Sequence, residues 1–479
     1  MLSILVLASQ AAIAQRPGTI PAPARTLPEI TAPKPEDALD LDIQTHPWTL
    51  KECINHALEN NIELQRTALT IDEARIARKQ SRLNFIPSLN AGSSSTTTFG
   101  RILTPDTYDF RGNSTITDAT ASVQASTVIF AGLRKHHEAK RSDLGLQAAL
   151  LKLHEAHDDI ALNVTAAYLE VLFAKENIKI TEKQLETLVL QVEQTSAQVD
   201  EGNGLLSDLL QLQAQMAEAE YDMLEADNEL ILAYFELAQL LEIRDYHSFT
   251  VVFPEHYNMT LLSDLSSSEE IYSMAQSLPQ IEAAKVHVSI AETDIKIAKG
   301  ALYPTLTLTG GYGSSYSDGV HKSLHDPENA ANYIEARYPF KEQIRNNASA
   351  YIYFNLNIPI FNSATARNNV RIKNIALQRA NYDLQLTRKQ VSVEIQQAFI
   401  DAHSALEQYN ASVRNVDIIE ETFLLIKQEY NLGRATPVDY SIALYNLINA
   451  ESQLIQAKYQ YIFSSKILDF YRGMPIELY

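Results

Sequence analysis

The segment NLGRATPVDYS, residues 431–441, interrupts a helical pattern that extends for dozens of residues before it and resumes after it. Gly433 can adopt the left-handed conformation that closes a helix, Thr436 can cap the next helix, and Pro437 suits the first turn of that helix. The segment therefore predicts a bend between two helices. The same kind of bend is predicted once before, at DEGNGLLSDLL, residues 200–210.

The two bends belong to an internal repeat. Asp208 lies six residues after Gly202, and Asp439 lies six residues after Gly433, so one constant shift relates the bends, and we call it the bend shift. The bend shift also superimposes VIFAG on PIFNS (128–132 on 359–363) and VTAAYLEVLFA on IQQAFIDAHSA (164–174 on 395–405). Three anchors in one register indicate that the chain contains two copies of one unit.

Upstream of these anchors the shift between the copies is smaller. The segment NFIPSLN (84–90) matches ALYPTLT (301–307), with Pro87 on Pro304, and we call this the strand shift. The second copy must therefore contain an insertion between Pro304 and Phe361. Loops accept insertions more readily than helices do. We expect repeat 1 over residues 46–250, a connector over 251–266, and repeat 2 over 267–479 with a longer loop at 313–348.

Segments on both sides of the loop alternate between apolar and polar residues, as strands do. Residues 119–129 place mostly Ala, Val and Ile on one face and Thr, Ser and Gln on the other, and residues 305–316 and 350–360 also alternate. With the Ser- and Thr-rich segment 87–99, each copy provides two antiparallel strands, which makes four per chain. Such strands suit a transmembrane β-barrel. Four strands cannot enclose a pore, and an open edge in lipid leaves backbone groups unsatisfied, so several chains must share the barrel.

Between strand and bend, each copy has a long segment of helical pattern. Residues 133–200 and 364–431 carry heptad-like Leu, Ile, Val and Ala, and Gly145 is the only glycine or proline in them. At 1.5 Å per residue, each segment predicts a helix on the order of 100 Å long. Helices of this length suit coiled-coil packing against neighbours. The expected fold is mostly α with a small β part.

The composition excludes several classes of protein. The net charge of -20 and the lack of a basic stripe argue against nucleic-acid binding. Cys53 is the only cysteine, so no intrachain disulfide can form. No segment after residue 15 has the roughly 18 uninterrupted apolar residues of a membrane-spanning helix, and the best candidate, 229–242, contains three glutamates.

The N-terminus has the features of an exported protein. The apolar run in MLSILVLASQAAIAQ and its Ala-Ile-Ala cleavage pattern predict a signal peptide over residues 1–14, although the usual positive region is missing. The alternative is a buried N-terminal strand or helix. Residues 15–45 are a Pro-rich N-terminal segment, typical of a flexible or polyproline spacer.

From residue 48 to residue 473 the chain resembles the TolC-like outer membrane efflux protein family. The resemblance rests on the opening WTLKECINHALENNIEL, the Pro-bounded strands, the VIFAG and PIFNS junctions, and the two bends with Gly and Asp six residues apart. It implies a homotrimer with a shared twelve-stranded β-barrel in outer-membrane lipid and a long coiled-coil α-barrel in the periplasm. It also implies a closed tip, opened by a periplasmic adaptor (a membrane fusion protein) and energised by an inner-membrane RND or ABC pump.

The resemblance also implies a periplasmic gate at the bends. In the family an acidic residue of the first bend is held by a tyrosine and an arginine of the second. Asp208 and Tyr430 occupy the matching positions here, whereas Ala435 replaces the arginine and Arg434 lies one residue earlier. Asp439 matches the first of a pair of inward carboxylates, and Ile442 replaces the second. The alternatives are helix capping for the two aspartates and helix packing for Tyr430.

Histidine pairs are the main candidates for other chemistry. They are His136 with His137, His154 with His157, and His321 with His325. None has the spacing of a zinc-protease motif, and no third ligand is indicated, so we expect no metal site. No nucleophile elbow, phosphate-binding loop or dinucleotide fingerprint is present, so neither an enzyme nor a cofactor is expected.

The function expected from these features is an outer-membrane exit duct for the efflux of drugs, dyes or metal ions. Two alternatives remain. The chain could be the outer-membrane component of a type I protein secretion system, or a soluble periplasmic coiled-coil scaffold that never enters the membrane.

Overall fold

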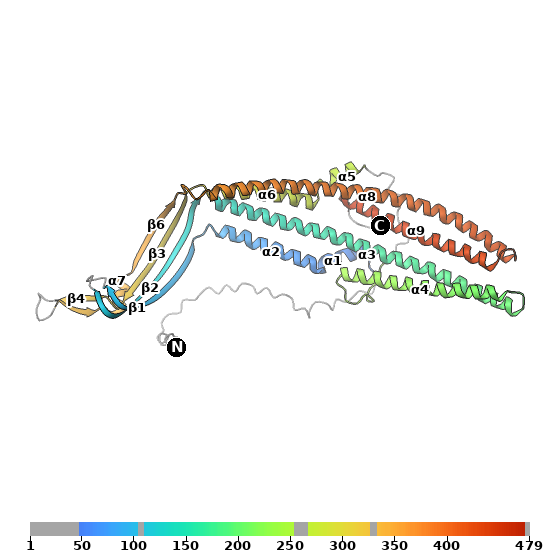
Figure 1. The fold of residues 1–479 in the computed structure, drawn as a ribbon, viewed down its shortest axis with the longest axis horizontal. Coiled ribbons are helices and arrows are strands. Elements are labelled where there is room, and N and C mark those ends of the chain that lie inside the picture. Colours follow the sequence, from blue (N-terminus) through green and yellow to red (C-terminus); the bar gives the residue numbers. More distant parts are fainter. Residues whose placement is uncertain (1–46, 104–109, 253–266, 326–332, 475–479) are drawn as a thin grey trace. The chain divides into compact units, whose positions relative to one another are not determined.

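The computed structural model describes residues 47–103, 110–252, 267–325 and 333–474. The predicted signal peptide, the Pro-rich N-terminal segment and most of the predicted connector lie outside these residues. The described part, from Pro47 onward, is a layer of helices continued by a small sheet (Figure 1). No helix within it has the length and apolar character needed to cross a membrane.

The element order shows the two copies directly. Repeat 1 contains α1 (Leu50–Asn60), α2 (Ile62–Leu83), β1 (Ser88–Leu103), β2 (Phe110–Ala131), α3 (Arg134–Asp200) and α4 (Leu206–Leu240). Repeat 2 contains α5 (Ser268–Met274), the 3-10 helix η2 (Ala275–Ser277), α6 (Pro279–Gly300), β3 (Thr305–Ser317), β4 (His321–His325), β5 (Tyr333–Arg337), α7 (Phe340–Asn346), β6 (Ser349–Asn357), α8 (Thr365–Asn431) and α9 (Pro437–Tyr471). The predicted long helices, bends and four strands are therefore found in the expected order, whereas β4, β5 and α7 were not predicted.

The bounds of the elements follow the two shifts found in the sequence. Helices α3 and α8 are each 67 residues long, and α4 and α9 are each 35 residues long. The bend shift relates the first residue of α3 to the first residue of α8. It also relates the first residue of α4 to the first residue of α9. Helices α2 and α6 are each 22 residues long, and the strand shift relates their first residues. The repeat found in the amino-acid sequence is therefore also a repeat of secondary structure.

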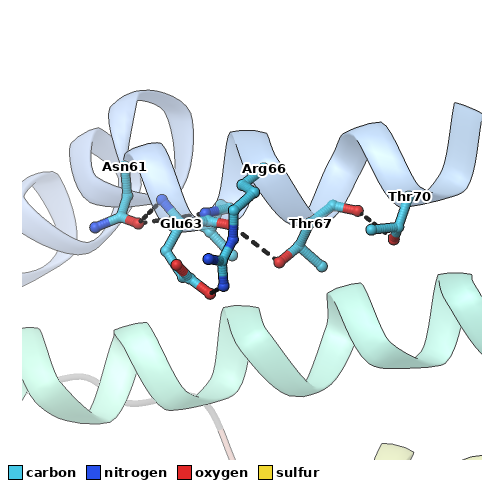
Figure 2. Close-up of polar contacts among 6 residues, drawn as sticks. Asn61, Glu63, Arg66, Thr67 and Thr70 are labelled. Atoms are coloured by element: carbon cyan, nitrogen blue, oxygen red, sulfur yellow. Dashed lines mark hydrogen bonds and ion pairs between the residues drawn. The ribbon is translucent and has the colours of Figure 1, made fainter.

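Each repeat breaks its first helical segment at the same place. In repeat 1, Asn61 has an extended backbone, and its side-chain oxygen accepts hydrogen bonds from the N–H groups of Glu63 (2.9 Å) and Leu64 (3.3 Å), which starts α2. Figure 2 shows this cap and the local contacts that follow it, including the Arg66–Glu63 ion pair. The equivalent Leu278 is also extended, and Pro279 starts α6.

The four predicted strands form one antiparallel sheet with the order β1-β2-β3-β6. The pairing inside the two repeats has the same register, because Ser88 pairs with Ser126 and the equivalent Thr305 pairs with Asn357. Strand β6 ends at Asn357, before the predicted end at residue 360. Pro359 follows closely and has no N–H to donate to a β-ladder.

The segment predicted as a longer loop in repeat 2 contains regular structure. Strands β4 and β5 pair with each other, and α7 packs against β3. The buried side-chain amide of Gln343 accepts from the N–H of Ser317 (3.0 Å) and donates to its carbonyl (2.8 Å). Gln343 therefore satisfies the edge of β3 beyond Gly313, the last residue of β3 that pairs with β6.

Each strand-to-helix junction passes through two consecutive residues with positive φ. They are Gly132 and Leu133 before α3, at 61° each, and Ser363 (55°) and Ala364 (61°) before α8. Only glycine adopts this conformation without steric cost. Gly132 is also confined, because a Cβ atom there would lie 2.7 Å from the carbonyl oxygen of Gly300.

The largest core cluster joins α1, the start of α2, α3, α4, the segment after α4, and α9 of repeat 2. Tyr168 lies at its centre, fully buried, and its hydroxyl lies 2.8 Å from the carbonyl oxygen of Val252 and 3.2 Å from that of Trp48. Trp48 and Val251 form a parallel β-bridge in the same region. Tyr168 therefore ties the start and the end of repeat 1 to the middle of α3. The equivalent Phe399 is partly buried against a second cluster, so both aromatic residues of this equivalent pair serve in packing.

Candidate functional site

The two bends close their helices with the same hydrogen bonds. In the first bend, the N–H of Gly202 donates to the carbonyl of Val199 (3.0 Å), and that of Asn203 donates to the carbonyl of Gln198 (2.8 Å). The equivalent distances in the second bend are 2.9 Å from Gly433 to Tyr430 and 2.8 Å from Arg434 to Glu429. The two glycines have φ values of 77° and 69°. This pattern is the Schellman closure expected for both bend glycines.

The helices after the bends begin differently. Asp439 and Thr436 form a capping box, in which the N–H of Asp439 donates to the Thr436 hydroxyl oxygen (3.2 Å) and the N–H of Thr436 donates to the Asp439 carboxylate (3.0 Å). The Thr436 hydroxyl also lies 2.7 Å from the carboxylate. These hydrogen bonds hold the pKa of Asp439 below its ordinary value. The capping alternative is therefore confirmed for Asp439.

Asp208 has the same position in α4 but not the same role. Leu205 occupies the position of Thr436 and makes no side-chain capping hydrogen bond. The Asp208 carboxylate accepts a hydrogen bond from the neighbouring Ser207 hydroxyl (3.2 Å), and the residue is partly buried in the first turn of α4. Because α4 uses no side-chain cap, the carboxylate of Asp208 is available for a contact outside its own helix.

A hydrophobic cluster joins the two helical hairpins close to the bends. It contains Leu188 and Leu212 from the α3–α4 hairpin, and Phe423, Tyr440 and Leu444 from the α8–α9 hairpin. Burial raises the pKa of the Tyr440 hydroxyl, and a hydrogen bond with Gln191 of α3 opposes that shift. The bends are therefore held side by side by a packed core.

The remaining predicted gate residues differ in their surroundings. Tyr430 is partly buried, and its ring centroid lies 5.2 Å from that of Tyr440. Arg434 is exposed and forms no ion pair within the described residues of this chain. Ile442 is exposed and lines a groove between α8 and α9 that also includes Asp439. The structure thus places Tyr430 in the cluster that joins the hairpins and leaves Arg434 at the surface.

Sequence reasoning missed two residues of this region, Gln191 and Tyr440. Both are buried, and both join α3 to α9. Gln191 lies within the helical pattern of residues 133–200, and nothing in the neighbouring sequence predicts its contact with a residue of the other repeat. Tyr440 directly follows Asp439, and an aromatic residue in a first helical turn gives no indication of its partner.

The histidine pairs lie on helices and on β4. The rings of His136 and His137 are 5.7 Å apart, and those of His154 and His157 are 6.2 Å apart, all within α3. Burial lowers the pKa of His137 and of His157, and a neighbouring histidine adds to both shifts. Across the residues that the structure covers, no group of three or more His, Cys, Asp or Glu side chains has a geometry suited to a metal ion.

The capping box predicts an asymmetric effect of mutation at the two bends. Thr436→Ala is expected to destabilise the start of α9 by about 1 kcal/mol, because α9 loses its side-chain cap. Amide hydrogen exchange over residues 436–440 would then be about fivefold faster. Leu205→Ala is the matched control at the equivalent position and should leave exchange at the start of α4 nearly unchanged. Equal effects of the two substitutions would contradict the assignment of the cap.

Comparisons with known proteins agree with this architecture. The family model for outer membrane efflux proteins matches residues 53–241 and 271–473, which is one match to each repeat. Outer membrane protein TolC of Vibrio cholerae is 25% identical over 432 residues, which cover 87% of this chain and 88% of TolC. The alkaline protease secretion protein AprF of Pseudomonas aeruginosa is 22% identical over 435 residues, covering 87% and 83% of the two chains.

A solved structure has the same fold. The CmeC outer membrane channel of Campylobacter jejuni superimposes with a TM-score of 0.75 at 18% identity, over 90% of this chain and 86% of CmeC. The matched family model covers both repeats, including α3, α8 and both bends. From the two repeats, the four-stranded sheet and this match, it follows that the chain is a non-enzymatic member of the outer membrane efflux protein family and resides in the outer membrane.

Proposed function

We propose that three copies of the chain form an exit duct that carries small molecules, such as drugs, dyes or metal ions, out of the cell. A periplasmic adaptor opens the duct, and an inner-membrane pump energises it. The observation that carries this proposal is the four-stranded sheet, whose two edges are β1 and β6. An edge in lipid leaves its N–H and C=O groups unsatisfied, so the sheet needs the edges of further copies to close.

One face of β6 is apolar, which supports a position in lipid. Its alternating residues Ile352, Phe354 and Leu356 are exposed in the single chain. A soluble periplasmic scaffold would expose this apolar face to water, which is unfavourable by about 25 cal/mol per Å² of apolar surface. This arrangement therefore favours the duct over the scaffold.

The nature of the cargo separates efflux from protein secretion. The family name refers to efflux, whereas AprF is named for the secretion of a protease. The chain can be expressed in a host that lacks its own exit duct and that carries either a drug pump with its adaptor or a protein exporter with its adaptor. Restored drug resistance without restored secretion supports the efflux proposal, and the reverse result supports secretion.

We further propose that Asp208 holds the closed tip by contacts with Tyr430 and Arg434 of the assembled duct. Asp208 makes no capping contact with Leu205, Arg434 is exposed, and the packed cluster around Tyr440 holds both bends together. A charge-assisted hydrogen bond between such groups contributes about 1.5–3 kcal/mol.

Asp208→Ala is accordingly expected to loosen the tip and raise single-channel conductance in planar bilayers. Asp439→Ala is the matched control, since its carboxylate is already committed to Thr436 and its loss should affect mainly the start of α9. Unchanged conductance of the Asp208 variant would contradict the gate proposal. A larger increase for the Asp439 variant would show that the second carboxylate controls the tip.

A further inference from the structure

The contact between the two helical hairpins contains buried polar side chains as well as the apolar ones described above. Gln191 and Thr195 of α3 and Ser441 of α9 are only 5%, 2% and 5% exposed. Gln191 and Thr195 are four positions apart, so they lie on one face of α3. Ser441 directly follows Tyr440, whose hydroxyl forms a hydrogen bond with Gln191. We call Gln191, Thr195 and Ser441 the polar seam.

Each residue of the polar seam has a buried oxygen atom without a hydrogen-bond partner among the described residues. These atoms are Oε1 of Gln191, Oγ1 of Thr195 and Oγ of Ser441. Most buried polar groups in proteins have a partner, because removing such a group from water without one costs free energy. The three oxygens are already enclosed within a single chain, so a second copy cannot reach them. The closed packing of the hairpins therefore leaves these groups unsatisfied.

Other buried threonines show how a hydroxyl in a helix is usually satisfied. The hydroxyl of Thr165, fully buried in the same helix α3, donates to the carbonyl of Ala161 one turn earlier (2.7 Å). The hydroxyl of Thr293 in α6 donates to the carbonyl of Ser289 in the same way (2.8 Å). Within the part of the chain that the structure covers, Thr195 makes no such bond. Its unpaired hydroxyl is therefore specific to this position near the bend.

The other copy of the repeat shows that the helical unit does not need polar residues at these positions. Under the bend shift, Thr195 corresponds to Ile426 of α8, which packs against the hydrophobic cluster that joins the hairpins. Ser441 corresponds to Leu210 of α4, which is exposed. An apolar residue therefore occupies the place of Thr195 in an equivalent helix of the same length. The polarity of the seam thus requires a reason other than the folding of the unit.

The helices inside each hairpin are held together more extensively than the two hairpins are held to each other. Helix α3 packs along α4, and α8 packs along α9, whereas α9 makes fewer contacts with α3 and α4. The bends also connect the two helices of each hairpin covalently. A separation near the bends would therefore occur between the hairpins, at the contact that contains the polar seam, and would leave each hairpin folded.

We propose that the polar seam keeps the contact between the two hairpins weak, so that the hairpins separate near the bends while each stays folded. When α9 moves away from α3, water reaches the three oxygens and supplies their missing hydrogen bonds, which lowers the free-energy cost of separation. The proposal rests on the proposed duct, whose tip an adaptor opens, and it deepens that function. It assigns the ease of opening to buried groups, whereas the contacts of Asp208 are proposed to hold the closed tip.

Cysteine labelling measures how often the hairpins separate. Ala443 is buried in the cluster that joins them, so Ala443→Cys in the purified protein reacts with iodoacetamide only when α9 moves away. The native Cys53 is fully buried, and burial raises its pKa to about 12, so it reacts slowly. Adding Thr195→Val is expected to slow the labelling of Ala443→Cys about fivefold, because valine removes the unsatisfied hydroxyl at nearly the same volume. An unchanged or faster rate would overturn the proposal.

Thr165→Val is the matched control for this substitution. It makes the same chemical change at an equally buried position of the same helix, about 45 Å from Thr195 along α3. The hydroxyl that it removes is satisfied by the carbonyl of Ala161, so no unsatisfied group is relieved. The labelling rate of Ala443→Cys should therefore stay the same. Equal slowing by the two valine variants would show a general effect of losing a threonine and would overturn the role of the polar seam.

Ser441→Ala removes a second unsatisfied hydroxyl and is expected to slow the labelling further when it is combined with Thr195→Val. Conductance in planar bilayers, measured on the same proteins, separates the polar seam from the proposed duct. A chain that conducts, but in which neither substitution slows labelling, would overturn the polar seam and leave the duct standing. A chain that labels in the expected order, but never conducts, would overturn the duct and leave the polar seam standing.

Discussion

Gly132→Ala is expected to destabilise the folded chain by about 2–5 kcal/mol, since alanine in a left-handed conformation costs about 1–2 kcal/mol and overpacking adds about 1–3 kcal/mol. The overpacking arises because the new Cβ atom would lie 2.7 Å from the Gly300 carbonyl oxygen and 2.9 Å from the Tyr303 Cβ atom. These neighbours are backbone or lie close to it, so they cannot move aside easily. Thermal unfolding of the detergent-solubilised protein, followed by circular dichroism, measures the effect.

The matched control for this substitution is Gly145→Ala. Gly145 lies inside α3, and a Cβ atom there would meet no atom within 4 Å. Alanine at this position should stabilise the helix by about 0.5–1 kcal/mol. The same chemical change is thus expected to have opposite signs at the two sites. Wild-type stability of the Gly132 variant would show that the junction tolerates a side chain and that the close approach to Gly300 is not required.

Tyr168→Ala is expected to cost about 3–5 kcal/mol, because it removes a fully buried aromatic ring from the main core cluster. Tyr168→Phe separates packing from hydrogen bonding. It keeps the ring but leaves the Val252 carbonyl without the hydroxyl 2.8 Å away, which costs about 1–3 kcal/mol. The carbonyl of Trp48 keeps a hydrogen bond from the N–H of Val252 (2.8 Å).

Denaturation of the purified protein, followed by fluorescence of Trp48, measures both variants, because Trp48 is the only tryptophan and lies beside this core. Phe399→Ala is the matched control in repeat 2, where the equivalent ring is only partly buried. Its cost should be smaller than that of Tyr168→Ala. A cost below about 0.5 kcal/mol for both Tyr168 variants, the range of ordinary surface substitutions, would contradict the central role of this residue in repeat 1.

Much of the fold could be predicted because the signals are local and occur twice. A bend needs a left-handed residue and a helix start, and both are visible around Gly202 and Gly433. Alternation with period two identified the strands, and the two shifts aligned the copies to the residue. Strand ends were less predictable, since β6 ends where its pairing with Thr305 of β3 begins. That pairing depends on β3, which is separated from β6 in the sequence by β4, β5 and α7.

The candidate site was predictable as a location but not in its details. Asp208 and Asp439 are equivalent in sequence, yet only Asp439 is committed to a cap, because Thr436 and Leu205 differ in their ability to accept a hydrogen bond. The contact of Gln191 with Tyr440 joins α3 to α9, and no pattern along either helix indicates the other partner.

The sequence by itself determined the repeated unit, the type and order of its helices and strands, and the position of both bends. These depend on conformational preferences that act over a few residues and on periods of 2 and 3.6. Only the tertiary structure decided which apolar faces are covered. Val286 of α6 is buried and the equivalent Leu69 of α2 is exposed, although both lie on the same face of equivalent helices. The reason is that burial depends on which distant segment packs against a face, and that neighbour is present for α6 but absent for α2 within one chain.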